Sequence, residues 1–146
     1  MGDITRLRKN SEKKVVSVSA AEIKAGDVTS TALQELFNIP PDALIINAGM
    51  VIEQAGQAGL TVDMGFDGGA ELGNDYDCAT EGYEQTLLAT TSGGTVTTPA
   101  PRILSGTGKT VTAKFSAVPT SGVFHFIVEY IEYKLGNGTL TQLGNG

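Results

Sequence analysis

The stretch VFHFIVEYIEY, residues 123–133, decides the fold that this sequence predicts. In an extended chain, successive side chains point to opposite faces. One face would carry the side chains of Phe124, Phe126, Val128 and Tyr130, and the other would carry those of Val123, His125, Ile127, Glu129 and Ile131. Because both faces are largely apolar, we expect a central strand, or a strand buried against another subunit.

Further segments have the residue types or the alternation of strands. They are residues 15–18, expected at a sheet edge, and residues 43–53, 60–66, 95–97 and 110–115. Residues 60–66 alternate strictly between apolar and polar, which predicts a strand with one wet face. In residues 43–53 the pattern places Leu44, Ile46, Ala48, Met50 and Ile52 on one face. Gly49 in the same run indicates a bulge or a close backbone contact.

Two segments predict something other than a strand. Residues 30–37 contain a capping-box pattern, Thr31 to Gln34, followed by an apolar face, and they predict a short helix that Asn38 and the prolines after it would end. Residues 67–84 are rich in glycine and acidic residues and predict a long loop.

The predicted fold class is therefore all-β, an antiparallel β-sandwich or jelly roll with one short helix. The length of 146 residues suits one domain. We expect residues 1–25 to form a basic N-terminal arm, residues 26–134 the β-sandwich domain, and residues 135–146 a Gly- and Asn-rich C-terminal tail.

The net charge of −6 is unevenly distributed along the chain. Residues 1–24 hold six basic and three acidic side chains, whereas the remainder holds four basic and thirteen acidic ones. An acidic body disfavours nucleic-acid binding, because phosphate contacts need Lys and Arg. The basic leader, residues 1–14, could lie on an acidic partner surface or meet nucleic acid, or it could be a solvated, partly disordered arm.

The sequence offers little chemistry for catalysis. His125 is the only histidine, and its place between two phenylalanines predicts a packed core or interface residue. Cys78, the only cysteine, lies in the acid-rich loop, and neighbouring acids make a thiol less reactive. A lone cysteine also excludes an internal disulfide and suits synthesis in a reducing cytoplasm. We therefore expect no enzyme activity, no catalytic residue, no cofactor and no small-molecule substrate.

Two motifs are weak signals for ligands. The stretch GTGKT, residues 106–110, looks like the end of a phosphate-binding loop, but Ile103 stands where the pattern needs glycine, so we expect a hairpin turn. The acidic residues around the predicted loop favour a solvated loop and leave calcium as an alternative; they are Asp63, Asp67, Glu71, Asp75 and Asp77. No run of 18 apolar residues occurs, so no membrane span is expected.

Residues 26–55, 106–122 and 126–133 together resemble small virion structural proteins of tailed bacteriophages, of the head-decoration or capsid-cement kind. The resemblance implies a sandwich or jelly roll, often trimeric, that binds the major capsid protein on the head surface of the virion. A phage tail, fibre or baseplate component and a carbohydrate-binding module remain alternatives, with a small hydrolase ranked last.

The expected sites are interfaces, not pockets. Partner contacts are expected in the basic leader, at Arg6, Arg8, Lys9, Lys13 and Lys14. Subunit packing is expected on the last strand, at Phe124, Phe126 and Tyr130.

Overall fold

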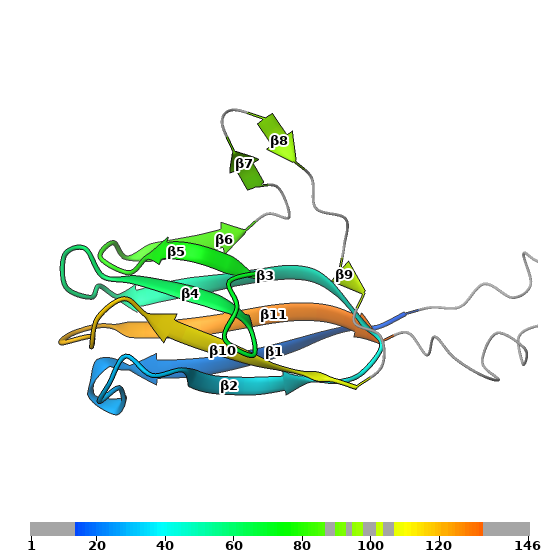
Figure 1. Ribbon diagram of the computed structural model, residues 1–146, viewed down its shortest axis with the longest axis horizontal. Coiled ribbons are helices and arrows are strands. Elements are labelled where there is room, and N and C mark those ends of the chain that lie inside the picture. Colours follow the sequence, from blue (N-terminus) through cyan, green and yellow to red (C-terminus); the bar gives the residue numbers. More distant parts are fainter. Residues whose placement is uncertain (1–13, 87–89, 93–94, 98–101, 104–106, 133–146) are drawn as a thin grey trace, which may run out of the picture.

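The computed structural model describes residues 14–86, 90–92, 95–97, 102–103 and 107–132, and it consists almost entirely of antiparallel strands (Figure 1). Sheet A contains β1 (Val16–Lys24), β11 (Val123–Glu132), β3 (Ala43–Gln54) and β6 (Gly82–Thr86) in that order, with β9 (Arg102–Ile103) also paired to β3. Sheet B contains β2 (Gln34–Ile39), β10 (Lys109–Phe115), β4 (Thr61–Phe66) and β5 (Gly73–Asp77). A separate hairpin joins β7 (Thr90–Ser92) to β8 (Thr95–Thr97).

The strand order brings the two ends of the described chain together. The first strand pairs with the last, β1 with β11, and the second pairs with the last but one, β2 with β10. Leaving aside the short β9, the order of four strands in each layer is that of a jelly roll, and it confirms the predicted antiparallel sandwich. The start of β1 and the end of β11 therefore lie at the same end of the sandwich, where Val16 is opposite Ile131 (Figure 1).

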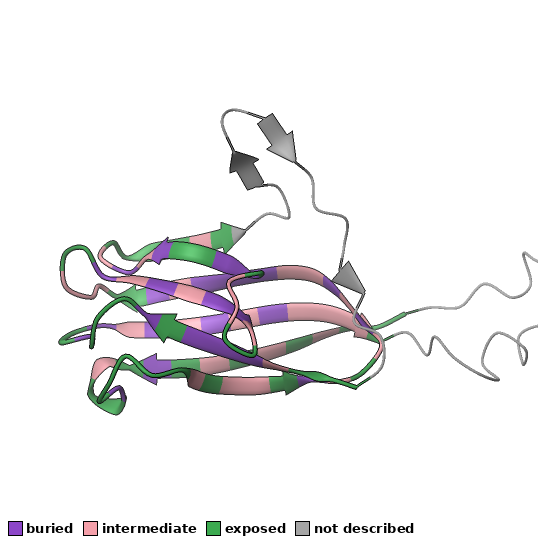
Figure 2. Ribbon diagram, in the orientation of Figure 1, coloured by how far each residue is buried: buried purple, intermediate pink, exposed green. Residues whose placement is uncertain are grey.

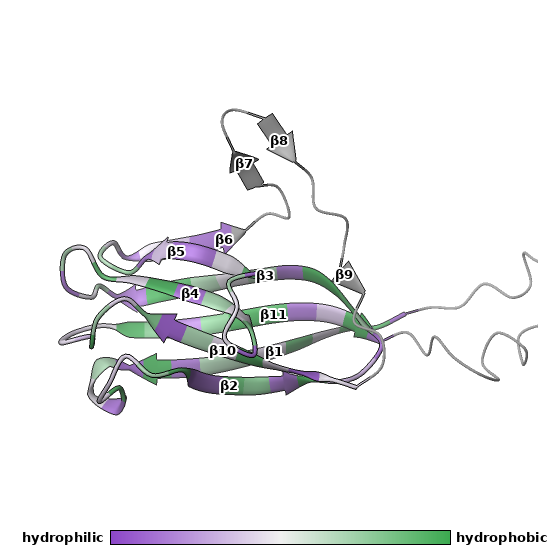
Figure 3. Ribbon diagram, viewed as in Figure 1, coloured by the Kyte–Doolittle hydropathy of each residue, from purple (hydrophilic) through white to green (hydrophobic). Residues whose placement is uncertain are grey.

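The core lies between the two sheets, where buried positions alternate with more exposed ones along the strands (Figure 2). Hydrophobic residues occur along strands of both layers (Figure 3). Phe115 of β10 packs against Phe124 and Phe126 of β11, with ring centroids 5.5 and 6.4 Å apart. These three rings join the centre of sheet B to the centre of sheet A.

The strand predictions for residues 43–53, 60–66, 95–97 and 110–115 are confirmed as β3, β4, β8 and β10. The central position predicted for the last strand is also confirmed, because β11 lies between β1 and β3. Residues 16–24 of the expected N-terminal arm form β1, which pairs with β11 over its whole length at the edge of sheet A.

The predicted short helix is wrong, because residues 34–39 form β2. The Oγ of Ser30 accepts a hydrogen bond from the amide of Ala32 in a local turn, and the strand then pairs with β10. Local capping signals compete with such turns, and hydrogen bonds to a distant strand decided the outcome. The helix that the structure does contain is the 3₁₀ turn η1 (Ala25–Asp27).

The predicted loop at residues 67–84 is wrong in part, because it contains β5 and the beginning of β6. Within β3, the prediction that five residues share one face holds for Ala48, Met50 and Ile52, which are buried, but not for Leu44 and Ile46 before them. A shift between Asn47 and Ile45 puts Ala43 and Ile45 in the core in place of the neighbouring Leu44 and Ile46. Gly49 marks a close contact and not a bulge, since a Cβ there would lie 2.8 Å from the Tyr83 hydroxyl.

Candidate functional site

The expected partner-binding residues of the leader mostly precede the described chain. Arg6, Arg8, Lys9 and Lys13 lie outside the described residues, and Lys14 is the first residue that the structure places. Lys14 is exposed and lies two residues before β1 begins. The leader is therefore joined to the sandwich at the end where β11 also finishes.

The expected subunit-contact residues point into the chain's own core. Phe124 and Phe126 are fully buried between the two sheets, and Tyr130 is partly buried against the same cluster. The apolar face of β11 that carries Phe124 and Phe126 is thus buried inside a single chain. Phe124 and Phe126 have no exposed surface with which to contact a second subunit.

The opposite side of sheet A is open, and we call it the outer face of sheet A. It is formed by alternate residues of β1, β11 and β3, among them Val16, Val18, Ala20, Glu22, Val123, His125, Ile127, Glu129, Ile131, Leu44, Asn47, Val51 and Glu53. Val16 and Val18 are 47% and 60% exposed, and Val15 just before them is 79% exposed. Exposed apolar side chains on an edge strand are typical of a surface that contacts protein.

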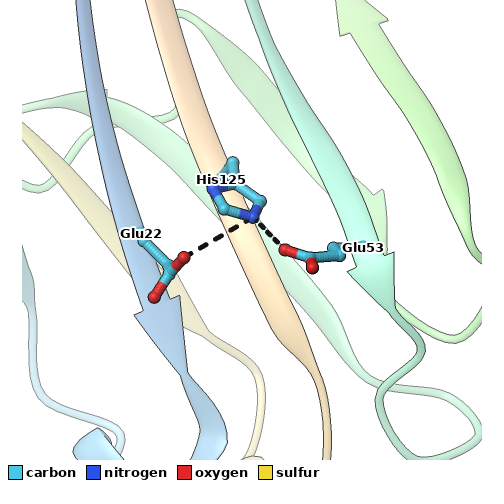
Figure 4. A group of neighbouring side chains, drawn as sticks. All are labelled: Glu22, Glu53 and His125. Atoms are coloured by element: carbon cyan, nitrogen blue, oxygen red, sulfur yellow. Dashed lines mark hydrogen bonds and ion pairs between the residues drawn. The ribbon is translucent and has the colours of Figure 1, made fainter.

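Three polar side chains meet on this outer face at one position along the strands. His125 of β11 lies between Glu22 of β1 and Glu53 of β3 (Figure 4). The His125 Nε2 is 2.5 Å from Oε2 of Glu53 and 3.8 Å from Oε2 of Glu22. The His125 side chain is 31% exposed and both carboxylates are more exposed, so the cluster is accessible to solvent and to ions.

Sequence reasoning grouped His125 with Val123, Ile127 and Glu129 on one face of its strand but expected a packed core or interface residue. The structure places its side chain on the outer face, 31% exposed, beside two glutamates that the sequence analysis did not connect with it. Glu22 and Glu53 are separated from it by about a hundred and by about seventy residues, and no local motif connects them. The pairing registers of β1 and β3 with β11 bring them together.

Cys78 is buried in the core and cannot form a catalytic pair with His125, which lies on the outer face. Burial raises the pKa of the Cys78 thiol to about 12, and the negative charges of Asp77 and Glu84 add to the increase. The thiol is therefore protonated at neutral pH, and it lacks the thiolate that nucleophilic chemistry needs.

We expect Cys78 of the folded protein to resist alkylation by iodoacetamide at pH 8, because the thiol is both buried and protonated. The rate of modification, followed by intact mass, should rise at least a hundredfold when the chain is unfolded in guanidinium chloride. Equal rates in the folded and the unfolded protein would contradict the buried position of this residue.

The acidic residues considered for calcium do not converge on one point. Glu71 accepts a hydrogen bond from the Phe66 amide, Asp63 accepts one from the Asp75 amide, and Asp77 accepts one from the Ala79 amide. Asp67 lies 3.7 Å from Lys109 in an ion pair. These carboxylates stabilise turns around β4 and β5. Among the described residues, Glu22, Glu53 and His125 are the His and acidic side chains whose ligand atoms all lie within 4.8 Å of one another.

The segment that looked like part of a phosphate-binding loop enters a strand. Lys109 and Thr110 begin β10, and a Cβ at Gly108 would collide with the carbonyl oxygen of Ile39. A phosphate loop would precede a helix, so this part of the chain has the wrong local structure. Within the part of the chain that the structure describes, no helix is long and apolar enough to cross a membrane.

Together, the fold and this accessible outer face define a small jelly-roll protein with an exposed edge strand. Its structure is similar to a chain in the capsid of Ralstonia phage GP4, with a TM-score of 0.61 and 18% identity, over 82% of this chain and 86% of that one. It is also similar to a chain in the capsid asymmetric unit of cyanophage Pam1, with a TM-score of 0.59 and 14% identity, over 84% and 89% of the two chains. At these identities the likeness establishes the shared fold. No family model and no curated protein matches the sequence.

Proposed function

We propose that this chain is a non-enzymatic structural protein of a phage virion, and that it is a decoration or cement protein on the surface of the head. In this role it binds the lattice of the major capsid protein and stabilises neighbouring capsid subunits against separation. The observation that carries the proposal is the jelly roll shared with components of two phage capsids. Jelly rolls are common in viral capsid proteins, although lectin domains also use them.

The extent of the structural match supports a small separate component. The alignments cover more than four fifths of this chain and of each matched chain. The matched chains are therefore about as long as this one. A single sandwich of this kind is sufficient to be a component of a capsid.

The basic leader is our candidate for attachment to the capsid. Its charged residues Arg6, Arg8, Lys9, Lys13 and Lys14 carry positive charge in a chain whose remainder is strongly acidic. An acidic capsid surface would attract this segment and repel the body, and such attraction is weakened by salt. Attachment through the leader would thus orient the sandwich with one end toward the shell.

The outer face of sheet A is our candidate for contact between copies of the chain, which we expect to form a trimer. It exposes Val16 and Val18 on an edge strand, and Tyr83 of β6 is 50% exposed. A closed ring of copies is the usual way to cover such a surface. Light scattering on the purified chain would give three times the mass of 15.1 kDa if the expectation holds.

We expect the full chain to sediment with empty heads assembled from the major capsid protein of the same phage, and deletion of residues 1–14 to weaken this binding at least tenfold. The reason is the loss of five of the chain's ten basic side chains. Binding of the full chain should also weaken as the salt concentration rises from about 50 to about 500 mM, because salt screens the attraction between the basic leader and an acidic capsid surface.

The matched control is a deletion of residues 135–146, which removes a similar length of chain but no charged side chain. It should bind as the full chain does, and circular dichroism should show the same β signal for all three proteins. Equal binding by both deletions would exclude the leader as the attachment segment. Failure of the full chain to bind heads would overturn the decoration role, and binding to tails or to a glycan array instead would favour one of the alternative functions.

A further inference from the structure

The cluster of Glu22, Glu53 and His125 has the composition and the position of a metal site. The three residues come from three neighbouring strands, and their ligand atoms all lie within 4.8 Å of one another (Figure 4). Each points to the outer face of sheet A, away from the core. The proposed role in the virion does not require this cluster, so its function is a separate question.

Strand pairing explains why the three side chains meet. Glu22 is directly opposite His125 in the pairing of β1 with β11. On the other side of β11, Phe124 is opposite Ile52 and Val123 is opposite Gln54, so Glu53 is an extra residue in β3. An extra residue of this kind is a β-bulge, which redirects side chains and is common beside functional sites. The bulge leaves Glu53 beside the imidazole of His125.

The donor atoms suit a divalent transition metal better than a hard cation. An imidazole nitrogen together with carboxylate oxygens is a set that zinc, cobalt and nickel accept, whereas calcium and magnesium prefer oxygen alone. Around tetrahedral zinc, with bonds of about 2.0–2.2 Å, ligand atoms stand roughly 3.3–3.5 Å apart. The present separations of 2.5 and 3.8 Å from the His125 Nε2 lie on either side of this spacing.

Only small side-chain movements are needed to reach that geometry. His125 lies on the central strand of the three, and the carboxylates of Glu22 and Glu53 are 44% and 64% exposed, so they can rotate without disturbing the core. Lys24 lies 3.4 Å from Oε1 of Glu22, which leaves Oε2 of that carboxylate directed at His125.

We propose that Glu22, Glu53 and His125 bind one zinc ion or a similar divalent transition metal on the outer face of sheet A. Three protein ligands leave at least one position for water or for a group from another molecule. The bound ion would link the edge strand β1 to β3 across β11 and replace the contact of His125 with Glu53. It would thereby hold the exposed edge of the sandwich in place.

The experiment is calorimetric titration of the full chain, without an affinity tag, with zinc chloride. We expect one ion per chain, and at least a tenfold loss of affinity in His125→Ala, in Glu53→Gln and in Glu22→Gln. Glu129→Gln is the matched control, because this glutamate lies on the same face of β11, opposite Val18 and Asn47. It should bind zinc as the unchanged protein does, and calcium should not bind at the same concentrations.

A second measurement identifies the ligand directly. His125 is the only histidine in the chain, so a proton NMR spectrum contains a single set of imidazole signals. Titration with cobalt should shift or broaden these signals at one equivalent. Zinc binding that persists in His125→Ala would overturn the proposal. So would zinc binding that is unchanged in both glutamate variants, since it would reduce the site to a lone imidazole.

Discussion

Phe126→Ala is expected to lower the free energy of unfolding by about 4 kcal/mol, which is a large part of the stability of a typical domain. The Phe126 side chain is completely buried and packs edge-on against Phe115 of the opposite sheet. Its removal leaves a cavity at the centre of the sandwich that the surrounding structure can close only in part. Urea denaturation followed by circular dichroism gives the change in unfolding free energy.

The matched control is Ile127→Ala, at the next residue of the same strand. Ile127 faces the opposite way and is only partly buried, so the expected cost is about 1 kcal/mol. Comparison of the two variants also tests whether Phe126 packs inside one chain or against a second subunit. Two results together would contradict the packing of Phe126 inside one chain. They are a changed mass in light scattering for Phe126→Ala, and an unfolding free energy for Phe126→Ala that is no lower than that of Ile127→Ala.

Gly65→Ala is expected to cost about 3 kcal/mol, although it adds a single methyl group. Gly65 is buried in β4, opposite Thr112 of β10. A Cβ at this position would collide with the backbone carbonyl of Gly69 and with the carboxylate of Glu71. Neither can withdraw freely, because both groups belong to the tight turn that follows Phe66. The Gly69 amide donates to the Phe66 carbonyl, and the Glu71 carboxylate accepts from the Phe66 amide.

Gly26→Ala is the control for Gly65→Ala, because a Cβ at Gly26 would have no neighbouring atom within 4 Å. Its effect should lie within about 0.5 kcal/mol of zero, as for other unconstrained surface changes. Thermal unfolding of the two variants side by side is sufficient. Equal melting temperatures would show that the turn after β4 is looser than its contacts imply.

Two strand positions in this protein follow from local side-chain pattern alone. The strict alternation of residues 60–66 and the two-sided apolar run that begins at Val123 each predicted a strand that the structure contains. A side-chain period of two is a property of the extended backbone itself. It needs no knowledge of the partner strand, so sequence reasoning could find it.

Residues 30–39 show where that reasoning fails. A capping-box pattern and a short apolar face predicted a helix, but pairing with β10 made the segment a strand. A short isolated helix is marginal on its own. The hydrogen bonds of β10 come from residues about seventy positions further along the chain, and they are invisible to any local pattern.

The sequence by itself determined that the protein is a β-sandwich, and it determined which residues of the last strand share a face. Only the tertiary structure decided which face is inside, and it placed Phe124 and Phe126 in the core and His125 on the open surface. It also decided that Glu22 and Glu53 stand beside His125, through one pairing register and one bulge. The physical reason is that side-chain alternation is a local property of the backbone, whereas register is set by hydrogen bonds between strands far apart in the chain.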